Sequence, residues 1–357
     1  MRRGYLLEAV ICVHNETSNL PELIHRLERV FATTGSWRQS IDRVLVTFVD
    51  DGSRDSLSEC TRELATQSPL EMRIVRLSRQ FGHQAAISAG LKQSRGDRVL
   101  LMDGDLQDPP EVVPTLLNAM DQGHDVVYGI RRNRKEVFWR RLGYWAFYRF
   151  SQRIGAPLPL DAGDFAVLSR RVVNQLTSLG GVIRFNREER SWLGFRQTGI
   201  PYDRGNRHQG VSKYSLFSLI QLALDGITSS SIKPLWLPAL LCLIYGVASV
   251  GLGLCFLGTT SPQTQHFLLT LVFISLNQVF VLAALSVMGV YIGKTYLEAQ
   301  RRPPFIVEEV LSFPRPRPSL ETQLRDALAV VLDSKVTHPP SAPTLAVDGQ
   351  HPVRTLK

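Results

Sequence analysis

The sequence contains few cysteines, and they are spread widely along the chain. The four cysteines among 357 residues are Cys12, Cys60, Cys242 and Cys255, and no two of them lie within a few positions of each other. Small secreted domains depend on several paired cysteines, and zinc or redox motifs need closely spaced ones. The sequence therefore favours neither a disulfide framework nor a zinc site, and it fits a protein of a reducing compartment.

Two glycine patterns that bind phosphate groups are also missing. The chain contains neither Gly-x-Gly-x-x-Gly nor Gly-x-x-x-x-Gly-Lys-Ser/Thr. These patterns hold the phosphates of dinucleotides and nucleoside triphosphates by backbone N–H groups. A diphosphate bound by this chain would therefore need a metal ion and arginines instead.

Charged side chains are absent from two long apolar segments, 235–258 and 267–293. Each is longer than the roughly 20 residues that cross a hydrocarbon core of about 30 Å, so we predict a two-helix transmembrane hairpin. The connecting residues 259–266 carry no Lys or Arg, whereas Lys233 precedes the hairpin and Lys294 follows it. By the positive-inside rule, the domain before the hairpin and both termini are expected on the cytoplasmic side of the inner or plasma membrane.

The residues before the hairpin alternate between strand-like and helix-like patterns. Apolar runs predict strands at 9–13, 43–49, 73–77, 98–102 and 125–128, and amphipathic stretches predict helices at 20–31, 57–66, 84–93 and 111–121. Strands joined by helices of 10–15 residues are typical of βαβ units. We therefore predict an α/β domain with a mainly parallel sheet.

A basic and aromatic segment lies within residues 131–153, where eight arginines and lysines are interleaved with seven aromatic residues. Arginine- and aromatic-rich helices are typical of the lipid headgroup layer. Nucleic acid is the alternative ligand for such a segment, but a predicted membrane hairpin favours lipid. We expect interfacial helices at 137–154 and 213–232, and no nucleic-acid partner.

These patterns divide the chain into four parts. We expect an α/β domain over 1–230, the hairpin over 235–293, a cytoplasmic juxtamembrane segment over 294–311 and a mostly disordered tail over 312–357. The tail is rich in Pro, Ser and Thr, a composition that rarely forms a packed core.

Acidic and amide side chains follow three of the predicted strands. His14-Asn15-Glu16 follows the first, Asp50-Asp51-Gly52-Ser53 the second, and the segment from Asp103 to Asp108 the fourth. Because parallel strands present their carboxyl ends at one edge of a sheet, these residues are expected to meet at a ligand site. Taken alone, Asp51-Gly52-Ser53 is equally well explained as a turn.

The segment after the fourth strand carries the strongest signal. Asp103 and Asp105 alternate with Gly104, so in an extended chain both carboxylates would point to one side, with Gln107 in the same register. Mg²⁺ and Mn²⁺ prefer such oxygen ligands together with a substrate's phosphates. We therefore predict a Mg²⁺ or Mn²⁺ site at Asp103, Asp105 and Gln107; the alternative is an acidic loop in which Asp108 caps the next helix.

The ordered motifs resemble those of the family 2 glycosyltransferases. The segments that carry the resemblance are 13–16, 49–53, 77–84, 103–110, 161–165, 192–197, 212–214 and 224–228. Within the family they are most similar to polyprenyl-phosphate glycosyltransferases, relatives of dolichol-phosphate mannosyltransferase, and the similarity covers about residues 6–308. The chain departs from the usual pattern at His14, where Tyr is usual, at Gly104, where Ala is common, and at Glu188-Glu189, where uncharged residues are usual.

The resemblance implies a GT-A fold, one divalent metal, a nucleotide-sugar donor and a homo-oligomer such as a tetramer. It assigns nucleotide-sugar binding to Val13, Asn15, Glu16, Asp51, Gln84, Asp103 and Arg131. It assigns the acceptor phosphate to Arg187, Ser212 and Lys213, and catalysis to Asp105, Asp161 and Asp164. The expected reaction inverts the sugar's anomeric centre in one displacement by a polyprenyl (undecaprenyl) phosphate. Because a phosphate monoester has a second pKa near 6, no strong general base is needed, and Asp161 or Asp164 would orient the phosphate or assist as base.

Two other functions fit parts of the sequence. A polysaccharide synthase with a sugar hydroxyl as acceptor would be expected to have more membrane spans and a Gln-x-x-Arg-Trp motif, which this chain lacks. A non-catalytic membrane scaffold or flippase partner would not need clustered carboxylates. The residues do not distinguish UDP from GDP donors, name the sugar or indicate the downstream pathway.

Overall fold

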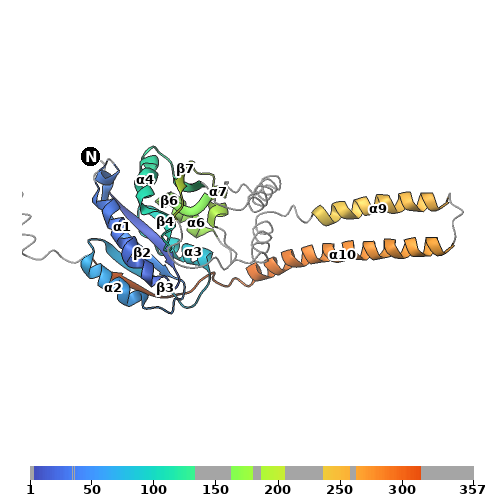
Figure 1. Ribbon diagram of the computed structural model, residues 1–357, viewed down its shortest axis with the longest axis horizontal. Coiled ribbons are helices and arrows are strands. Elements are labelled where there is room, and N and C mark those ends of the chain that lie inside the picture. Colours follow the sequence, from blue (N-terminus) through green and yellow to red (C-terminus); the bar gives the residue numbers. More distant parts are fainter. Residues whose placement is uncertain are drawn as a thin grey trace, which may run out of the picture. The chain divides into compact units, whose positions relative to one another are not determined.

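The structure is a computed structural model, and it describes residues 4–33, 35, 37–132, 162–179, 186–205, 236–257 and 263–314. The strands are β1 (Tyr5–Val13), β2 (Ile41–Asp50), β3 (Glu71–Leu77), β4 (Arg98–Asp103), β5 (Val126–Arg132), β6 (Ala162–Ser169), β7 (Gln197–Asp203) and β8 (Val307–Phe313). The helices are α1 (Leu20–Ala32), α2 (Leu57–Gln67), α3 (His83–Gln93), α4 (Val113–Asp121), α6 (Arg170–Ser178), α7 (Asn186–Trp192), α9 (Trp236–Leu257) and α10 (Gln263–Ala299). Figure 1 shows their arrangement.

The strands form one eight-stranded sheet in the order β7-β5-β6-β4-β1-β2-β3-β8. β1 lies between β2 and β4 and is parallel to both, and β2 is also parallel to β3. β6 runs antiparallel to β4 and β5, and β8 runs antiparallel to β3. The three strands that end in acidic motifs, β1, β2 and β4, are therefore neighbours, as the sequence predicted.

Helices cover both faces of the sheet, and the central strands are buried on both sides. Along β1, Leu7, Ala9 and Ile11 belong to the apolar cluster that includes side chains of α1, α2 and α4. Val10 and Cys12 belong to the cluster on the opposite face, which includes side chains of α3 and α6. This explains why the strand reads as a continuous apolar run rather than an alternating one, which is the pattern of buried parallel strands.

One buried ionic cluster joins the central strands at the edge away from the acidic loops. The Glu8 side chain is fully buried; it accepts hydrogen bonds from Thr47 Oγ1 (2.7 Å) and from Arg73 Nη2 (2.9 Å). Its second oxygen accepts the backbone N–H groups of Arg95 (2.5 Å) and Gly96 (2.8 Å). Complete hydrogen bonding of this kind is what allows a carboxylate to remain in an apolar interior.

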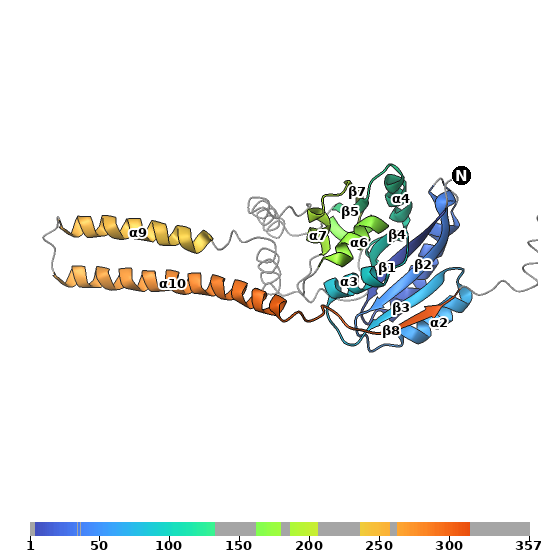
Figure 2. The ribbon, with the colours of Figure 1, turned by 180° about the vertical axis from the view of Figure 1, so that it is seen from behind.

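The C-terminal end of the described chain corrects one boundary. Residues 307–311 were assigned to the juxtamembrane segment and 312–313 to the disordered tail, but together they form the edge strand β8 (Figure 2). Only every second residue of β8 is shielded from solvent, so its sequence carries a weak signal, and pairing with β3 decides its conformation. The rest of the tail lies outside the described residues.

Two long helices occupy the apolar segments. α9 has 22 residues and α10 has 37, so the helix α10 continues beyond the predicted segment 267–293. The Tyr245 ring of α9 stacks on Phe273 of α10 with ring centroids 4.6 Å apart, and its O–H donates to the Phe273 carbonyl oxygen. Among the described residues, one stretch, Leu269–Ala299, is long and apolar enough to cross a membrane. The predicted interfacial helices 137–154 and 213–232 lie outside the described residues.

The buried ionic cluster generates a prediction about stability. Glu8→Ala should destabilise the full chain by about 3–5 kcal/mol, because it leaves the buried Arg73 guanidinium without its carboxylate. Thermal unfolding of the detergent-solubilised protein checks this, with the exposed Glu59→Ala as control. Equal melting temperatures for the two variants would show that the buried contacts of Glu8 do not stabilise the fold.

Candidate active site

The loops after β1 and β2 are held together by hydrogen bonds. The Asp51 backbone N–H donates to the Val13 carbonyl (3.1 Å), and His14 Nδ1 donates to the Asp51 carbonyl (2.9 Å). Asn15 has a left-handed backbone (φ 54°), and its N–H donates to Ser53 Oγ (3.0 Å). The histidine that replaces the usual tyrosine therefore has a local role, which is to hold the second loop.

The Asp51 carboxylate supports the loop between β3 and α3. It is buried, and its oxygens accept the backbone N–H groups of Phe81 (2.7 Å) and Gly82 (2.9 Å). Gly52, at φ 69°, permits the close approach, since a Cβ there would lie 2.5 Å from the backbone nitrogen of Gln80. The turn expected as an alternative is thus present, and contact of Asp51 with a nucleoside stays a prediction.

The segment after β4 turns earlier than the sequence predicted. β4 ends at Asp103, the Gly104 N–H donates to the Cys12 carbonyl (3.2 Å), and Leu106 is buried with a left-handed backbone (φ 61°). The expectation that Asp103, Asp105 and Gln107 alternate along an extended chain is therefore wrong, because burying Leu106 bends the loop.

The residues of this turn have separate contacts. Asp105 accepts the Gln107 backbone N–H (3.1 Å), and the Gln107 carbonyl accepts the Gly205 N–H (2.9 Å). A Cβ at Gly104 would lie 3.1 Å from Glu16 Oε2. Glycine at this position therefore lets the loops after β1 and β4 approach each other closely, which brings Glu16 beside the acidic turn as the sequence predicted.

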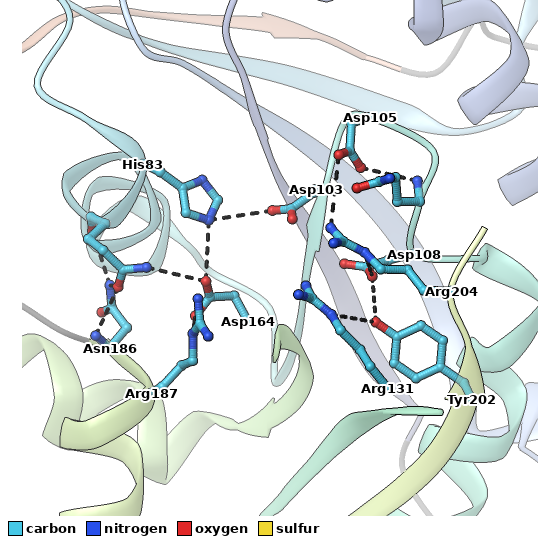
Figure 3. Close-up of polar contacts among 12 residues, drawn as sticks. His83, Asp103, Asp105, Asp108, Arg131, Asp164, Asn186, Arg187, Tyr202 and Arg204 are labelled. Carbon is cyan, nitrogen blue, oxygen red and sulfur yellow. Dashed lines mark hydrogen bonds and ion pairs between the residues drawn. The ribbon is translucent and has the colours of Figure 1, made fainter. Parts of the chain in front are cut away.

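Figure 3 shows Asp103 between two groups of side chains. The Asp164 group consists of His83, Asp164, Asn186 and Arg187, together with Gln84. The Asp108 group consists of Asp105, Asp108, Arg131, Tyr202 and Arg204.

Asp164, on β6, is the centre of the first group. Its carboxylate accepts hydrogen bonds from His83 Nε2 (3.3 Å), Gln84 Nε2 (3.2 Å) and Arg187 Nε (3.0 Å). Burial raises the pKa of Asp164, but the hydrogen bond from His83 and the charge of Arg187 outweigh it and hold the pKa well below its usual range. An ionised carboxylate that already accepts three donors is a poor general base. Its geometry suits an electrostatic and orienting role.

Neighbouring side chains fix the orientation of the Gln84 amide. The backbone N–H and the side-chain Nδ2 of Asn186 both donate to Gln84 Oε1 at 3.0 Å, so the Gln84 NH₂ group must face Asp164. Asn186 is itself buried. Gln84 was predicted to bind the nucleotide-sugar; here its amide positions Asp164, and contact with a donor stays a prediction.

His83 lies between Asp103 and Asp164 and was not predicted as a site residue. Its Nε2 is 3.5 Å from Asp103 Oδ1 and 3.3 Å from Asp164 Oδ2. Burial lowers the pKa of His83, but the hydrogen bond to Asp164 and the charge of Asp103 raise it overall to about 8. The imidazole is therefore a cation near neutral pH, and it links the two acidic residues.

Asp108 is fully buried and does not cap the following helix. Its Oδ1 accepts the Tyr202 O–H at 2.5 Å, while Arg204 Nε lies 3.7 Å away. Its Oδ2 has no hydrogen-bond partner among the described residues. Burial raises the pKa of Asp108 despite the hydrogen bond from Tyr202. Pro109-Pro110 leads into a helical turn at Pro110–Val112, at the start of the helix predicted over 111–121.

Arginines face this acidic edge from several elements. Arg131, at the end of β5, donates to Tyr202 Oη (3.4 Å), and Arg204 Nη2 lies 4.0 Å from Asp105 Oδ2. Arg190 of α7 is buried over the Tyr128 ring, and burial lowers its pKa to about 10. Arg190, Tyr202 and Arg204 were not predicted, because each acts through residues distant in sequence.

The acidic residues fit a divalent cation when phosphate oxygens complete its coordination. No group of three or more His, Cys, Asp or Glu side chains in the described part of the chain is arranged to hold a metal by itself. Burial raises the pKa of Asp103 to about 6, and the charges of Asp108, Asp164 and Asp105 add to that effect against the influence of His83. This excess of negative charge is what a bound cation would relieve. Mg²⁺ typically uses one or two carboxylates and the phosphates of its substrate.

Three predicted residues cannot be placed. Asp161, Ser212 and Lys213 lie outside the described residues. The described part of the site therefore contains the expected donor-side residues and Arg187, whereas the rest of the expected acceptor-phosphate site remains a prediction.

Comparison with known proteins identifies the family of this chain. The model of glycosyl transferase family 2 matches residues 8–177. An uncharacterized glycosyltransferase of Bacillus subtilis is 34% identical over 319 residues, which are 87% of this chain and 95% of that protein. The undecaprenyl-phosphate 4-deoxy-4-formamido-L-arabinose transferase of Pseudomonas syringae is 30% identical over 85% of this chain and 90% of that protein. A prophage bactoprenol glucosyl transferase homolog of Escherichia coli is 32% identical over 85% of this chain and 99% of that protein.

The chain belongs to the family 2 glycosyltransferases, which confirms the resemblance inferred from its motifs. The family and the mixed, mostly parallel sheet agree with the GT-A fold expected from the sequence. A glucosyl-3-phosphoglycerate synthase of Mycobacterium tuberculosis, crystallised with Mn²⁺, UDP and glucosyl-3-phosphoglycerate, has a TM-score of 0.43 and 20% identity, covering 63% of this chain and 78% of that chain.

The contacts between Asn186 and Gln84 lead to a prediction about protein stability. Asn186→Ala should destabilise the protein by about 1–3 kcal/mol, because the Gln84 side-chain oxygen and the Gln84 backbone carbonyl each lose the hydrogen bond from Asn186 Nδ2 in a buried environment. Thermal unfolding measures this, with the exposed Asn174→Ala on α6 as the matched control. If the two variants have the same melting temperature, the Asn186–Gln84 contact does not contribute to stability.

Proposed function

We propose that this glycosyltransferase transfers a single sugar, with inversion, from a UDP- or GDP-linked donor to a polyprenyl phosphate such as undecaprenyl phosphate. The observation that carries the proposal is the opposition of charges at the sheet edge. Asp103 and Asp105 supply carboxylates for a cation, while Arg131 and Arg187 supply guanidinium groups within the two flanking groups of side chains. Such a site suits a reaction between two phosphate-bearing substrates.

The acidic turn is the proposed donor end. Asp103 and Asp105, with Gln107, would hold Mg²⁺ or Mn²⁺ against the donor diphosphate. When bound, the cation would neutralise the charge that develops on the departing nucleoside diphosphate. Val13, Asn15, Glu16 and Asp51 belong to loops that the structure holds beside this turn, and they are the proposed contacts of the nucleoside.

The Asp164 group is the proposed acceptor end. Arg187 is oriented by its hydrogen bond to Asp164, and it would bind the acceptor phosphate together with Ser212 and Lys213. A lipid phosphate is largely deprotonated at neutral pH because its second pKa is near 6. It therefore needs orientation more than a base, which agrees with an Asp164 whose oxygens are already engaged.

The apolar helices support a membrane location. α10 contains one stretch long and apolar enough to span a bilayer, and α9 packs on it through Tyr245. We propose that the two helices form a transmembrane hairpin with the catalytic domain on the cytoplasmic side, and that the chain forms a homo-oligomer. The names of the relatives, which act on undecaprenyl phosphate or bactoprenol, support a lipid acceptor.

Product formation tests the function directly. The purified full chain, given Mg²⁺, undecaprenyl phosphate and radiolabelled UDP- or GDP-sugars in turn, should produce a chloroform-soluble labelled lipid with one of the donors. The same mixtures without the lipid acceptor are the control. Failure with every common donor would rule out the proposed reaction.

The proposed metal site predicts the effect of one charge-removing substitution. Asp105→Asn should lower kcat by about 100-fold or more, because it removes negative charge from the cation site. The melting temperature should change little, since the asparagine oxygen can still accept the Gln107 N–H. Asp42→Asn, at an exposed position, is the control. Full activity of Asp105→Asn would show that this carboxylate does not serve the metal.

A further inference from the structure

The strand that follows the long apolar helix joins the sheet beside the proposed donor end. After α10 ends at Ala299, the chain reaches β8, which pairs antiparallel with β3. The Ser78 N–H donates to the Ile306 carbonyl at 3.0 Å, directly before the strand begins. Figure 2 shows β8 lying along β3 at the edge of the sheet. Segments more than two hundred residues apart in sequence therefore meet at this edge.

An irregularity in the β3–β8 pairing places Glu309, and not Glu308, opposite Arg76. Leu77 is opposite Val307, whereas Arg76 is opposite Glu309, so Glu308 is an additional residue in β8. A bulge of this kind changes which side chains face the partner strand. Glu308 is exposed, while Glu309 is half-buried and faces Arg76.

Glu309 begins a chain of polar contacts that ends in the loop after β2. Its Oε1 is 2.6 Å from Arg76 Nη1, and Arg76 Nε donates to Asp50 Oδ2 at 3.1 Å. The other oxygen of Asp50 accepts the Ser53 backbone N–H at 2.7 Å. The Asp50 side chain is 1% exposed, so its charge depends on Arg76 for compensation.

The loop at the end of these contacts is the one that holds the proposed nucleoside residues. Ser53 Oγ accepts the Asn15 N–H, and Asp51, next to Asp50, anchors the backbone of Phe81 and Gly82. Val307 of β8 and Phe81 also pack against the same apolar cluster. Polar contacts therefore connect β8 to the loops after β2 and β3.

We infer that Glu309 is a positioning residue for the donor: through Arg76 and Asp50, it holds the 50–54 loop in the conformation that binds the nucleoside. The inference rests on the proposed function in assigning the nucleoside to this loop. Glu309 does not contact the substrate. Its effect is to keep Arg76 aligned with Asp50, so that the Asp50–Ser53 hydrogen bond forms before the donor arrives and less ordering is needed on binding.

Charge substitutions at Glu309 and Glu308 in the full chain separate this role from general effects. Glu309→Gln should raise the KM for the nucleotide-sugar by about two- to fivefold, and Glu309→Lys, which repels Arg76, by about tenfold. The KM for the polyprenyl phosphate should change by less than about twofold, because Glu309 reaches the Asp164 group only through the additional step from Asp51 to the backbone of Phe81 and Gly82. Glu308→Gln and Glu308→Lys carry the same charge changes on the same strand, and they should resemble the unmodified protein.

A ligand-free measurement accompanies the kinetics. Amide hydrogen exchange in peptides covering 50–54 and 78–84 should be faster in Glu309→Lys than in Glu308→Lys, by about two- to fivefold, since the loop loses its support. If the unmodified protein transfers no sugar from any donor, the proposed function fails while the exchange experiment still tests the contact.

Two outcomes would overturn the inference. One is equal exchange in the two lysine variants. The other is a KM for the donor that is no higher in Glu309→Lys than in Glu308→Lys. A KM for the donor that rises by the same factor as the KM for the acceptor counts in the same way. A donor-specific rise with faster exchange in the 50–54 loop supports it, and a conservative Glu309→Asp variant should then fall between the unmodified protein and Glu309→Gln.

Discussion

The candidate site depends on the crowding of four carboxyl groups at the edge of the sheet where β4 ends and the antiparallel strand β6 begins. Asp105, Asp108 and Asp164 are buried, and Asp103 lies between them with a partly exposed side chain. Buried negative charges are costly unless donors or cations compensate them. Asp164 has three such donors and Asp108 has Tyr202, whereas the one compensating contact of Asp103 within the described part of the chain is the long contact with His83. The resulting excess of negative charge makes this edge suited to a cation and its phosphate ligands.

Different parts of the fold build the two ends of the site. The proposed donor end comes from the loops after β1, β2 and β4, which follow neighbouring parallel strands and are joined by backbone hydrogen bonds. The proposed acceptor end comes from α3, β6 and α7, which hold Asp164 and Arg187 through side-chain contacts. Because β6 is adjacent to β4, the two ends of the site meet beside Asp103.

Much of this arrangement follows from local sequence patterns. The apolar runs of β1 to β4 and the helices between them were predicted to within a few residues, and so was the gathering of Glu16, Asp51 and Asp103 near one edge. The extended register of Asp103, Asp105 and Gln107 was wrong, because Leu106 turns into the core. β8 was missed for a related reason: an edge strand with one shielded face resembles a polar segment until its partner is known.

The sequence by itself determined which strands are buried, where the carboxylates leave them and which segments are apolar enough for a membrane. These properties depend on the type and spacing of residues within a short window, and burial imposes them directly. The tertiary structure alone decided which carboxylates are compensated and by what. Tyr202 and Asp108 are 94 residues apart, and Arg76 and Glu309 are 233 apart. Charge and hydrogen-bond interactions depend on distance in space, and no local pattern records the folding that brings such pairs together.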